Sequence, residues 1–337
     1  MPHVRDCLGQ GEMNSEIEKA AERTAAREKV REGAAGCQIM RLTDVTPFLR
    51  RIRLTLEMIK FEHSVFALPF ALTGALLAWS DEGFPREGAW AKLGWIVLAM
   101  VAARSVAMAF NRVLDADIDA RNPRTKMRHL PAGLLSKTFA WGFIGFWALV
   151  FLFAARELNP LCLKLAGPAL IVLMFYSVTK RFTMYSHVVL GFCLGMAPAA
   201  AWIAVRGALD PRILWLTVAV TLWTAGFDII YACQDYAFDV QSGLFSIPKR
   251  LGIAGALWVS RAFHLGMLVS LLFLVHAFAL GALALAGVGA VAGLLLWEHR
   301  LVKATDLSRV DAAFFTMNGY VSVIFFLFWA SDIFFLR

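Results

Sequence analysis

Long apolar runs constrain the fold of this chain more than any other feature of its sequence. Predominantly apolar stretches of bilayer length recur at residues 64–80, 93–111, 138–155, 162–179, 187–205, 213–232, 256–276, 278–297 and 313–335. A helix of roughly 17 to 25 such residues crosses a bilayer. Because lipid cannot hydrogen-bond the backbone, runs of this length favour helices over open strands. The sequence predicts an all-α polytopic membrane protein, with about nine spanning helices around a central cavity.

Composition agrees with a membrane protein and argues against a soluble one. The 337 residues are 59% hydrophobic and 17% charged, and the mean hydropathy is +0.63. The net charge of +8 is read as the positive-inside bias of a membrane protein, so we expect a lipid bilayer as partner and no nucleic acid. The five scattered cysteines include no CxxC pair, which leaves a disulfide framework or a zinc site without support.

Residues 1–50 differ from the remainder, 51–337, and are interpreted as a charged N-terminal extension. They are mixed in sign and poor in aromatic residues. Their acids, among them Glu16 and Glu22, argue against a transit peptide, and no apolar signal-peptide core precedes the first span. Met40 is a candidate for the true first residue.

Two clusters of polar residues lie where apolar runs end. The first cluster comprises Asn111, Asp115 and Asp119, and the second comprises Asp228, Tyr231, Asp235 and Asp239. The spacing of four predicts that each aspartate pair shares one helix face, with Asp228 and Tyr231 on roughly the same side as the second pair. Carboxylates beside lipid are costly and are rarely kept without a function. An alternative is that these acids cap helices or pair with nearby arginines.

The clusters suit a divalent metal held against an anion. Magnesium takes a few carboxylate oxygens and completes its shell with water and phosphate oxygens, so two such faces predict magnesium with a diphosphate between them. Nearby bases suit phosphate: Arg124, Arg128, Lys180 and Arg181. Tyr176, one turn before Lys180, could shield a cation with its ring. Taken singly, each base is also an ordinary topology marker.

Basic residues are unevenly shared between alternate loops. One set of loops carries Arg112, Arg121, Arg124, Lys126, Arg128, Lys137, Lys180, Arg181, Lys249, Arg250, Arg300, Lys303 and Arg309. The opposite set carries only Arg86, Lys92, Arg156, Arg206 and Arg212. The bias predicts a bacterial inner-membrane protein with its N-terminus and both clusters on the cytoplasmic side and its C-terminus outside.

Three charged or polar residues, Lys60, Glu62 and His63, enter the membrane together before the first span. They are read either as an interfacial anchor or as a recognition site for the acidic group of an otherwise flat substrate.

These motifs together resemble the UbiA superfamily of intramembrane prenyltransferases. The first signature is Asn111-x-x-x-Asp115-x-x-x-Asp119 with Arg124-Thr125-x-x-Arg128-x-Leu130-Pro131-x-Gly133. The second is Asp228-x-x-Tyr231-Ala232-x-x-Asp235-x-x-x-Asp239-x-x-x-Gly243-x-x-Ser246. Between them lies Tyr176-Ser177-x-x-Lys180-Arg181-x-Thr183, then Leu190-Gly191-x-x-x-Gly195. The similarity runs from about Lys60 to the last span.

The resemblance is greatest to the 4-hydroxybenzoate polyprenyltransferase branch, and it implies residue roles. Magnesium and diphosphate would be held by Asn111, Asp115, Asp119, Asp235 and Asp239. The catalytic set would be Asp115, Asp119, Asp235, Asp239 and Tyr176. Substrates would be bound by Asn111, Arg124, Arg128, Lys180, Arg181, Lys60, Asp228 and Tyr231.

The implied reaction moves a polyprenyl chain from its diphosphate to a ring carbon of a hydroxylated aromatic acid in quinone synthesis. The released proton would go to diphosphate, Asp117 or Asp228. Three departures concern the acceptor: His129 replaces a usual proline, Phe245 a usual lysine, and His63-Ser64 a usual Lys-Pro. They resemble a sub-branch that prenylates a naphthoate in futalosine-route menaquinone synthesis.

Two further readings stay open. Intramembrane acids also fit a transporter, although these acids lie at helix ends beside bases that suit phosphate. The same fold could instead farnesylate haem or prenylate a glycerol phosphate lipid.

Overall fold

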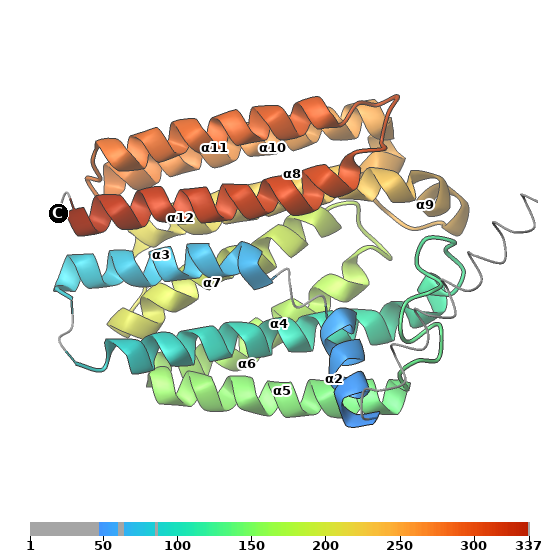
Figure 1. Ribbon diagram of the computed structural model, residues 1–337, viewed down its shortest axis with the longest axis horizontal. Helices are drawn as coiled ribbons and strands as arrows, with labels where there is room; N and C mark the ends of the chain where they lie inside the picture. The colour runs from blue at the N-terminus through green and yellow to red at the C-terminus, as the bar shows by residue number, and fades with distance from the viewer. Residues whose placement is uncertain (1–46, 60–63, 85–86, 336–337) are drawn as a thin grey trace, which may run out of the picture. The chain divides into compact units, whose positions relative to one another are not determined.

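The computed structural model describes residues 47–59, 64–84 and 87–335, and these ranges contain helices and no strand. The prediction of an all-α fold is confirmed (Figure 1). The elements are α2 Pro47–Met58, α3 Ser64–Glu82, α4 Ala89–Asp119, α5 Lys137–Leu158, α6 Pro160–Thr179, α7 Ser186–Arg206, η2 Pro211–Ile213, α8 Leu214–Ala232, η3 Cys233–Asp235, α9 Tyr236–Ser242, α10 Ile247–Ala277, α11 Ala282–Leu301, η4 Ala312–Met317 and α12 Asn318–Phe335.

The chain divides into two units, Met1–Thr55 and Leu56–Arg337. The described part of the first unit is the beginning of α2. The predicted extension, residues 1–50, lies almost wholly outside the described residues. All of the elements from α3 onward belong to the second unit.

Eight helical segments in the described residues are long and apolar enough to cross a membrane: Ala89–Asp119, Lys137–Leu158, Pro160–Thr179, Ser186–Arg206, Pro211–Ser242, Ile247–Ala277, Ala282–Leu301 and Ala312–Phe335. They correspond to eight of the predicted spans. The ninth, 64–80, coincides with α3, an apolar helix of 19 residues. Three spans differ most from the predicted bounds: the second extends to Asp119 rather than 111, the seventh begins at Ile247 rather than 256, and the eighth occupies 282–301 rather than 278–297.

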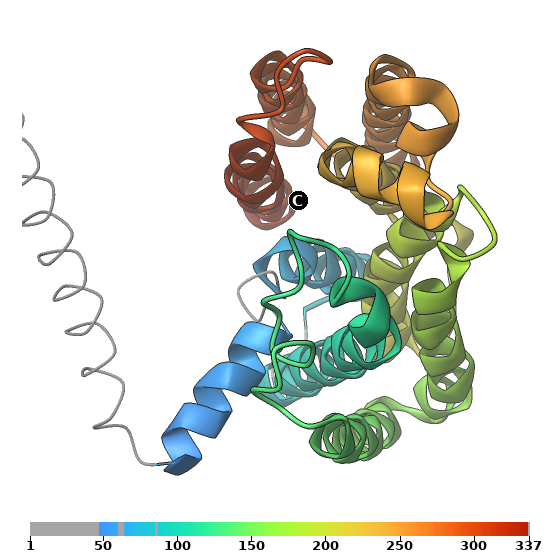
Figure 2. The same cartoon turned by 90° about the vertical axis from the view of Figure 1, so that its right-hand side faces the viewer.

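The helices of the second unit pack side by side in two connected groups. Contacts close a ring from α3 through α7, α8, α10, α11 and α12 back to α3, while α4, α5 and α6 pack together and join the ring through α7 and α3. Figure 2, which looks along the helices, shows this arrangement. The C-terminal ends of α4 and α8 thereby lie at the same end of the unit, the right-hand end in Figure 1.

Local sequence signals explain where these helices begin. The side chains of Ser136, Asn159 and Ser246 each accept a hydrogen bond from a backbone N–H in the first turn of α5, α6 and α10. Such caps satisfy donors that a helix leaves open at its N-terminus. Gly252 has a φ of 71° and kinks α10 near its start. The kink separates a short first turn, residues 247–251, from the rest of α10. The predicted span, 256–276, covers only the part after the kink.

Small residues let α7 lie directly against α8. A Cβ atom added to Gly191 would stand 2.2 Å from the carbonyl oxygen of Thr221, and one added to Gly195 would stand 2.2 Å from the Thr221 hydroxyl. Membrane helices commonly use such residues for close approach, because lipid supplies little drive for association. The contact fixes the N-terminal half of α7 against the middle of α8, about two turns before the second cluster begins at Asp228.

Candidate active site

The first cluster occupies the last turns of α4, as the spacing predicts. α4 is continuous from Ala89 to Asp119, so the three cluster residues share one face. Asn111 Nδ2 donates to Asp115 Oδ2 at 2.9 Å. Arg181, in the turn after α6, donates to Asp115 Oδ1 at 3.3 Å and to the Leu114 carbonyl at 2.9 Å. Asp115 is therefore partnered by a base from a distant turn of the chain, 66 positions later.

Asp119 ends α4 and has a separate cationic partner. Arg128 Nη1 lies 2.8 Å from both Asp119 carboxylate oxygens. Thr125 Oγ1 donates to the Asp119 carbonyl at 3.1 Å, which folds the following loop back onto the helix end. Asp119 is buried, and a buried carboxylate is stable only when it is paired. The loop residues of the first signature thus close over the acid that precedes them.

The second cluster is not one helix, which corrects the expectation drawn from its spacing. α8 ends at Ala232, a 3₁₀ turn carries residues 233–235, and α9 begins at Tyr236. The positions of Asp235 and Asp239 therefore straddle a change of helix type. Gly243, with a φ of 72°, ends α9 in a left-handed conformation that favours glycine. The break turns α9 out of the line of α8 (Figure 1).

Asp235 is held by the loop of the first cluster. Arg124 donates from Nε to Asp235 Oδ1 at 2.9 Å and from Nη2 to Oδ2 at 2.5 Å. Asn122 Nδ2 adds a third bond at 3.1 Å. Arg124 Nη1 also donates to the Tyr231 hydroxyl at 3.1 Å, with the guanidinium 5.3 Å from the tyrosine ring centre. A two-point grip of this kind fixes orientation as well as distance.

The electrostatics of Arg124 follow from this contact. Burial opposes its charge, but the hydrogen bonds and the attraction of Asp235 outweigh burial and raise the pKa of the guanidinium. Arg124 therefore stays protonated over the whole pH range in which proteins fold. The positive charge that Arg124 supplies to its ion pair with Asp235, which links the loop after the first cluster to the second cluster, therefore does not depend on pH in this range.

Asp239 pairs with the end of α6. Lys180 Nζ lies 2.8 Å from Asp239 Oδ1 in an ion pair, yet neither oxygen of this fully buried carboxylate accepts a well-formed hydrogen bond in the described structure. The Phe245 backbone N–H donates to the Lys180 carbonyl at 2.9 Å. This bond fastens the loop after α9 to the residue that holds Asp239.

Three more residues lie further inside the helices than the paired aspartates: Tyr176 in α6, His187 in α7 and Asp228 in α8. Tyr176 of α6 is near enough to Asp115 and Asp228 to interact with their charges. His187 Nδ1 lies 2.7 Å from Asp228 Oδ2. Sequence reasoning did not single out His187 or the bridging role of Asn122. A titratable residue near the start of an apolar span was the available signal for His187.

Other expected positions lie elsewhere. Lys60, Glu62 and His63 are outside the described residues, so the interpretation of this segment stays a prediction. Asp117 projects away from the cluster: its side chain is 84% exposed and pairs with Lys137 at 3.0 Å. The expectation that Asp117 receives a proton in the site is therefore wrong.

The departures from the hydroxybenzoate signatures adjoin the site. His129 Nε2 lies 3.4 Å from Glu57 Oε2, beside the Arg128 that holds Asp119. The Phe245 side chain is exposed, and Lys249 Nζ lies 5.5 Å from its ring centre. Both substitutions are thus neighbours of residues that hold cluster acids.

The carboxylates of the two clusters suit magnesium only if phosphate oxygens complete its coordination shell. In the described ranges, no three His, Cys, Asp or Glu side chains come together closely enough to hold a metal ion by themselves. Magnesium is usually bound by one or two carboxylates together with substrate phosphates. The aspartates of the clusters supply such carboxylates, and the buried oxygens of Asp239, which lack hydrogen bonds, remain able to accept a ligand. The residues therefore fit a metal that binds together with diphosphate.

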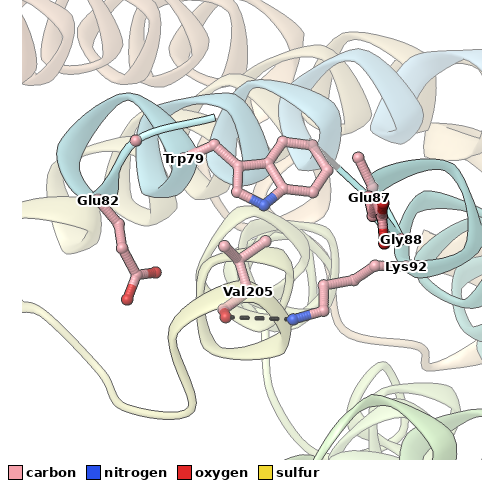
Figure 3. Close-up of a pocket in the computed structure, with 8 residues that line it drawn as sticks. Trp79, Glu82, Glu87, Gly88, Lys92 and Val205 are labelled. Carbon is pink, nitrogen blue, oxygen red and sulfur yellow. Dashed lines mark hydrogen bonds between the residues drawn. The ribbon is translucent and has the colours of Figure 1, made fainter. Parts of the chain in front are cut away.

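A pocket of about 320 Å³ lies at the other end of the helices. It is lined by Trp79 and Glu82 at the end of α3, Lys92 at the start of α4, and Val205 at the end of α7. Figure 3 shows Lys92 reaching the Val205 carbonyl, at 3.4 Å. The pocket shares no residue with either cluster.

Comparison with known proteins decides the family. Residues 67–331 match the model of the UbiA prenyltransferase family. The chain belongs to the UbiA prenyltransferase family. The protein is therefore an enzyme and an integral membrane prenyltransferase.

Relatives among characterised proteins are similar to parts of this UbiA chain. The 4-hydroxybenzoate octaprenyltransferase of Photobacterium profundum is 28% identical over 68% of this chain and 80% of its own length. The mitochondrial 4-hydroxybenzoate polyprenyltransferase of Arabidopsis thaliana is 34% identical over 47% of this chain. That match spans only 39% of the Arabidopsis protein.

Solved structures share the fold. The apo structure of a UbiA homologue from Aeropyrum pernix K1 is 33% identical, with a TM-score of 0.72 over 80% of this chain and 98% of that one. A UbiA homologue from Archaeoglobus fulgidus, bound to DMAPP and Mg²⁺, has a TM-score of 0.65 over 83% of this chain and 98% of that one, at 18% identity. The helical arrangement of the described residues is thus the fold of these solved UbiA homologues.

Proposed function

We propose that this enzyme, an aromatic prenyltransferase, transfers a polyprenyl chain from its diphosphate to a ring carbon of a hydroxylated aromatic acid, in respiratory quinone synthesis. One observation carries the proposal: the four aspartates that end α4 and follow α8 are each paired with a different Arg or Lys. The pairs are Asp115 with Arg181, Asp119 with Arg128, Asp235 with Arg124, and Asp239 with Lys180.

This arrangement provides both chemical halves of a metal-diphosphate site. Magnesium, when bound with the diphosphate, neutralises the leaving group. Asn111 and the four aspartates would hold it, while Arg124, Arg128, Lys180 and Arg181 would bind phosphate oxygens. These four bases, each paired with a carboxylate in the described structure, would exchange that partner for phosphate oxygens when the acids hold the metal. Support for such a complex comes from the Archaeoglobus homologue bound to Mg²⁺ and DMAPP.

Tyr176 and Tyr231 suit the allylic end of the substrate. Tyr231 belongs to the second cluster and accepts a hydrogen bond from Arg124, and Tyr176 lies within electrostatic range of Asp115 and Asp228. The negative face of either ring would stabilise a developing cation. The surrounding apolar helices exclude water, which would otherwise capture the cation. The lipid-facing sides of the helices carry exposed large apolar residues, so a long prenyl chain can remain in the bilayer.

The acceptor is proposed as 4-hydroxybenzoate or a related acid, because the matched relatives are named for that substrate. A naphthoate acid of futalosine-route menaquinone synthesis is the second candidate. It is favoured by His129 and Phe245, which differ from the hydroxybenzoate signatures and lie beside residues that hold cluster acids. Lys60 is proposed to contact the acceptor.

The test uses membranes that contain the full chain, magnesium and a polyprenyl diphosphate. We would offer 4-hydroxybenzoate and 1,4-dihydroxy-6-naphthoate separately and detect prenylated product by mass spectrometry. Asp115→Ala and removal of magnesium with EDTA should each abolish product. Asp117→Ala is the matched control, since this acid lies outside the site and should leave the rate unchanged.

The acceptor that yields product identifies the quinone. Full activity of both Asp115→Ala and Asp235→Ala would refute the proposed metal-diphosphate site. An absence of product with either acid, in a chain that is correctly inserted, would refute the aromatic acceptor and favour prenylation of another acceptor.

A further inference from the structure

Asp228 differs from the other acids of the site in the partner that it has. Asp115, Asp119, Asp235 and Asp239 each face an arginine or lysine. The ionic partner of Asp228 in the described structure is a histidine instead. Arg and Lys keep their protons near neutral pH, whereas a histidine can gain or lose one there. Asp228 is therefore the cluster acid whose immediate partner can take part in proton exchange.

His187 is enclosed behind Asp228. Its side chain is 4% exposed, against 20% for that of Asp228. The 2.7 Å contact joins His187 Nδ1 to Asp228 Oδ2, and beside a carboxylate oxygen Nδ1 is the donor. His187 Nε2 is buried and makes no hydrogen bond with the described residues. A buried, unpaired nitrogen is costly, so packing between α7 and α8 must hold the ring in this place.

Asp228 itself remains open on its other side. Its Oδ2 is bound to His187, and no hydrogen bond to Oδ1 is found in the described part of the chain. Asp228 lies one turn before Tyr231, on the same side of α8, and within electrostatic reach of Tyr176. Asp228 lies further from the end of α8 than Asp235 does. It would therefore be nearer to the prenyl chain of a polyprenyl diphosphate whose phosphates are held by the clusters.

We infer that Asp228 accepts the proton that leaves the aromatic ring, and that His187 is the positioning residue that orients Asp228 and shares this proton. The inference rests on the proposed function. The allylic C–O bond breaks with its electron pair on diphosphate, and ring electrons form the new C–C bond. The ring C–H bond then returns its electrons to the ring as its proton passes to Asp228 Oδ1. The products are the prenylated acid, diphosphate and one proton.

Substitution with glutamine separates positioning from simple packing. His187→Gln keeps a polar group that can donate to Asp228 but cannot take up a proton. Asp228→Asn keeps the shape and removes the basic oxygen. His276→Gln is the matched control, because His276 is exposed at the far end of α10.

Three quantities are measured for each variant in magnesium-loaded membranes. They are release of diphosphate without acceptor, transfer to the acceptor, and the isotope effect with acceptor deuterated at the substituted carbon. Asp228→Asn should lower kcat for transfer by about 100-fold or more, the lower range of what a proton acceptor contributes. His187→Gln should lower it by about 10-fold, because part of that contribution is orientation. KM for both substrates and diphosphate release should change little.

A primary isotope effect that the parent enzyme lacks should appear in both variants, since proton removal becomes limiting. The inference is overturned if both variants transfer at the parent rate, or if diphosphate release and transfer fall equally without an isotope effect. Should His187→Gln fail to accumulate, Asp228→Asn alone decides by the same isotope criterion. A parent enzyme that releases diphosphate and prenylates neither acid refutes the proposed function instead.

Discussion

Asp115 and Asp117 are two residues apart on α4 and have opposite surroundings. Helical geometry turns their side chains about 200° from each other around the axis. Asp115 meets Asn111 and Arg181 inside the site, whereas Asp117 is exposed and pairs with Lys137. Spacing alone therefore separates the acid that we assign to the site from its neighbour. It does not identify Arg181 as the partner, because 66 positions separate that arginine from Asp115.

Arg124→Lys tests the two-point grip on Asp235. Lysine carries the same charge, but it cannot make both carboxylate bonds and also reach the Tyr231 hydroxyl. We expect KM for the polyprenyl diphosphate to rise about 10-fold, the loss of roughly one charge-assisted hydrogen bond. Steady-state kinetics check this, with Lys126→Arg in the same loop as the control. An unchanged KM would show that Arg124 acts only as a point charge.

At the scale of elements, the clusters are built differently despite equal spacing. α4 carries its acids on an unbroken helix, but α8 gives way to a 3₁₀ turn and then α9. The break lets Asp235 face Arg124 while Asp239 faces Lys180. Repeated spacing of four predicts a shared helical face, and this expectation fails where tertiary pairing competes with helix continuation.

Close packing of α7 on α8 gives a prediction at this scale. In Gly191→Ala the added Cβ would press on the Thr221 carbonyl, and overpacking of this kind costs about 1–3 kcal/mol. The midpoint of thermal unfolding in detergent should fall, and activity should fall with it because His187 and Asp228 lie on these two helices. Gly289→Ala in α11 is the control, since nothing lies within 4 Å of its Cβ position. Equal midpoints for the two variants would contradict the close contact.

For the whole molecule, the helix order brings distant segments to one end. The loop after α4, the turn after α6 and the residues after α8 all contribute to the site. The C-terminal ends of α3 and α7 lie at the opposite end of the helices and line the separate pocket. We propose that the site end is cytoplasmic, because the loops there carry most of the basic residues.

Reporter fusions test this orientation. Alkaline phosphatase folds only outside the cytoplasm, so we expect it to be active when fused after Gly207 or Phe335 and inactive when fused after Asp306. A cytoplasmic fluorescent reporter at the same positions should give the reverse pattern. Phosphatase activity at Asp306 without activity at Gly207 would place the site on the outer face.

The helical elements of this protein, and the kinds of chemical group that it carries, follow from its sequence. Runs of bilayer length leave the backbone little alternative to helix, which is why the spans could be located from apolar pattern alone. The family signatures likewise indicated the acids and bases that we propose for the site. Both inferences rest on local information: each uses residues close together in the chain.

Which acid meets which base depends on how the helices pack. Arg124 lies 111 positions before Asp235, and His187 lies 41 before Asp228. Such pairs depend on how α4, α6, α7 and α8 pack, and spacing within one segment carries no information about them. The break after Ala232 and the enclosure of His187 were decided in the same way. In a low-dielectric interior, charged groups adopt the arrangement that pairs them, and packing determines which pairs can form.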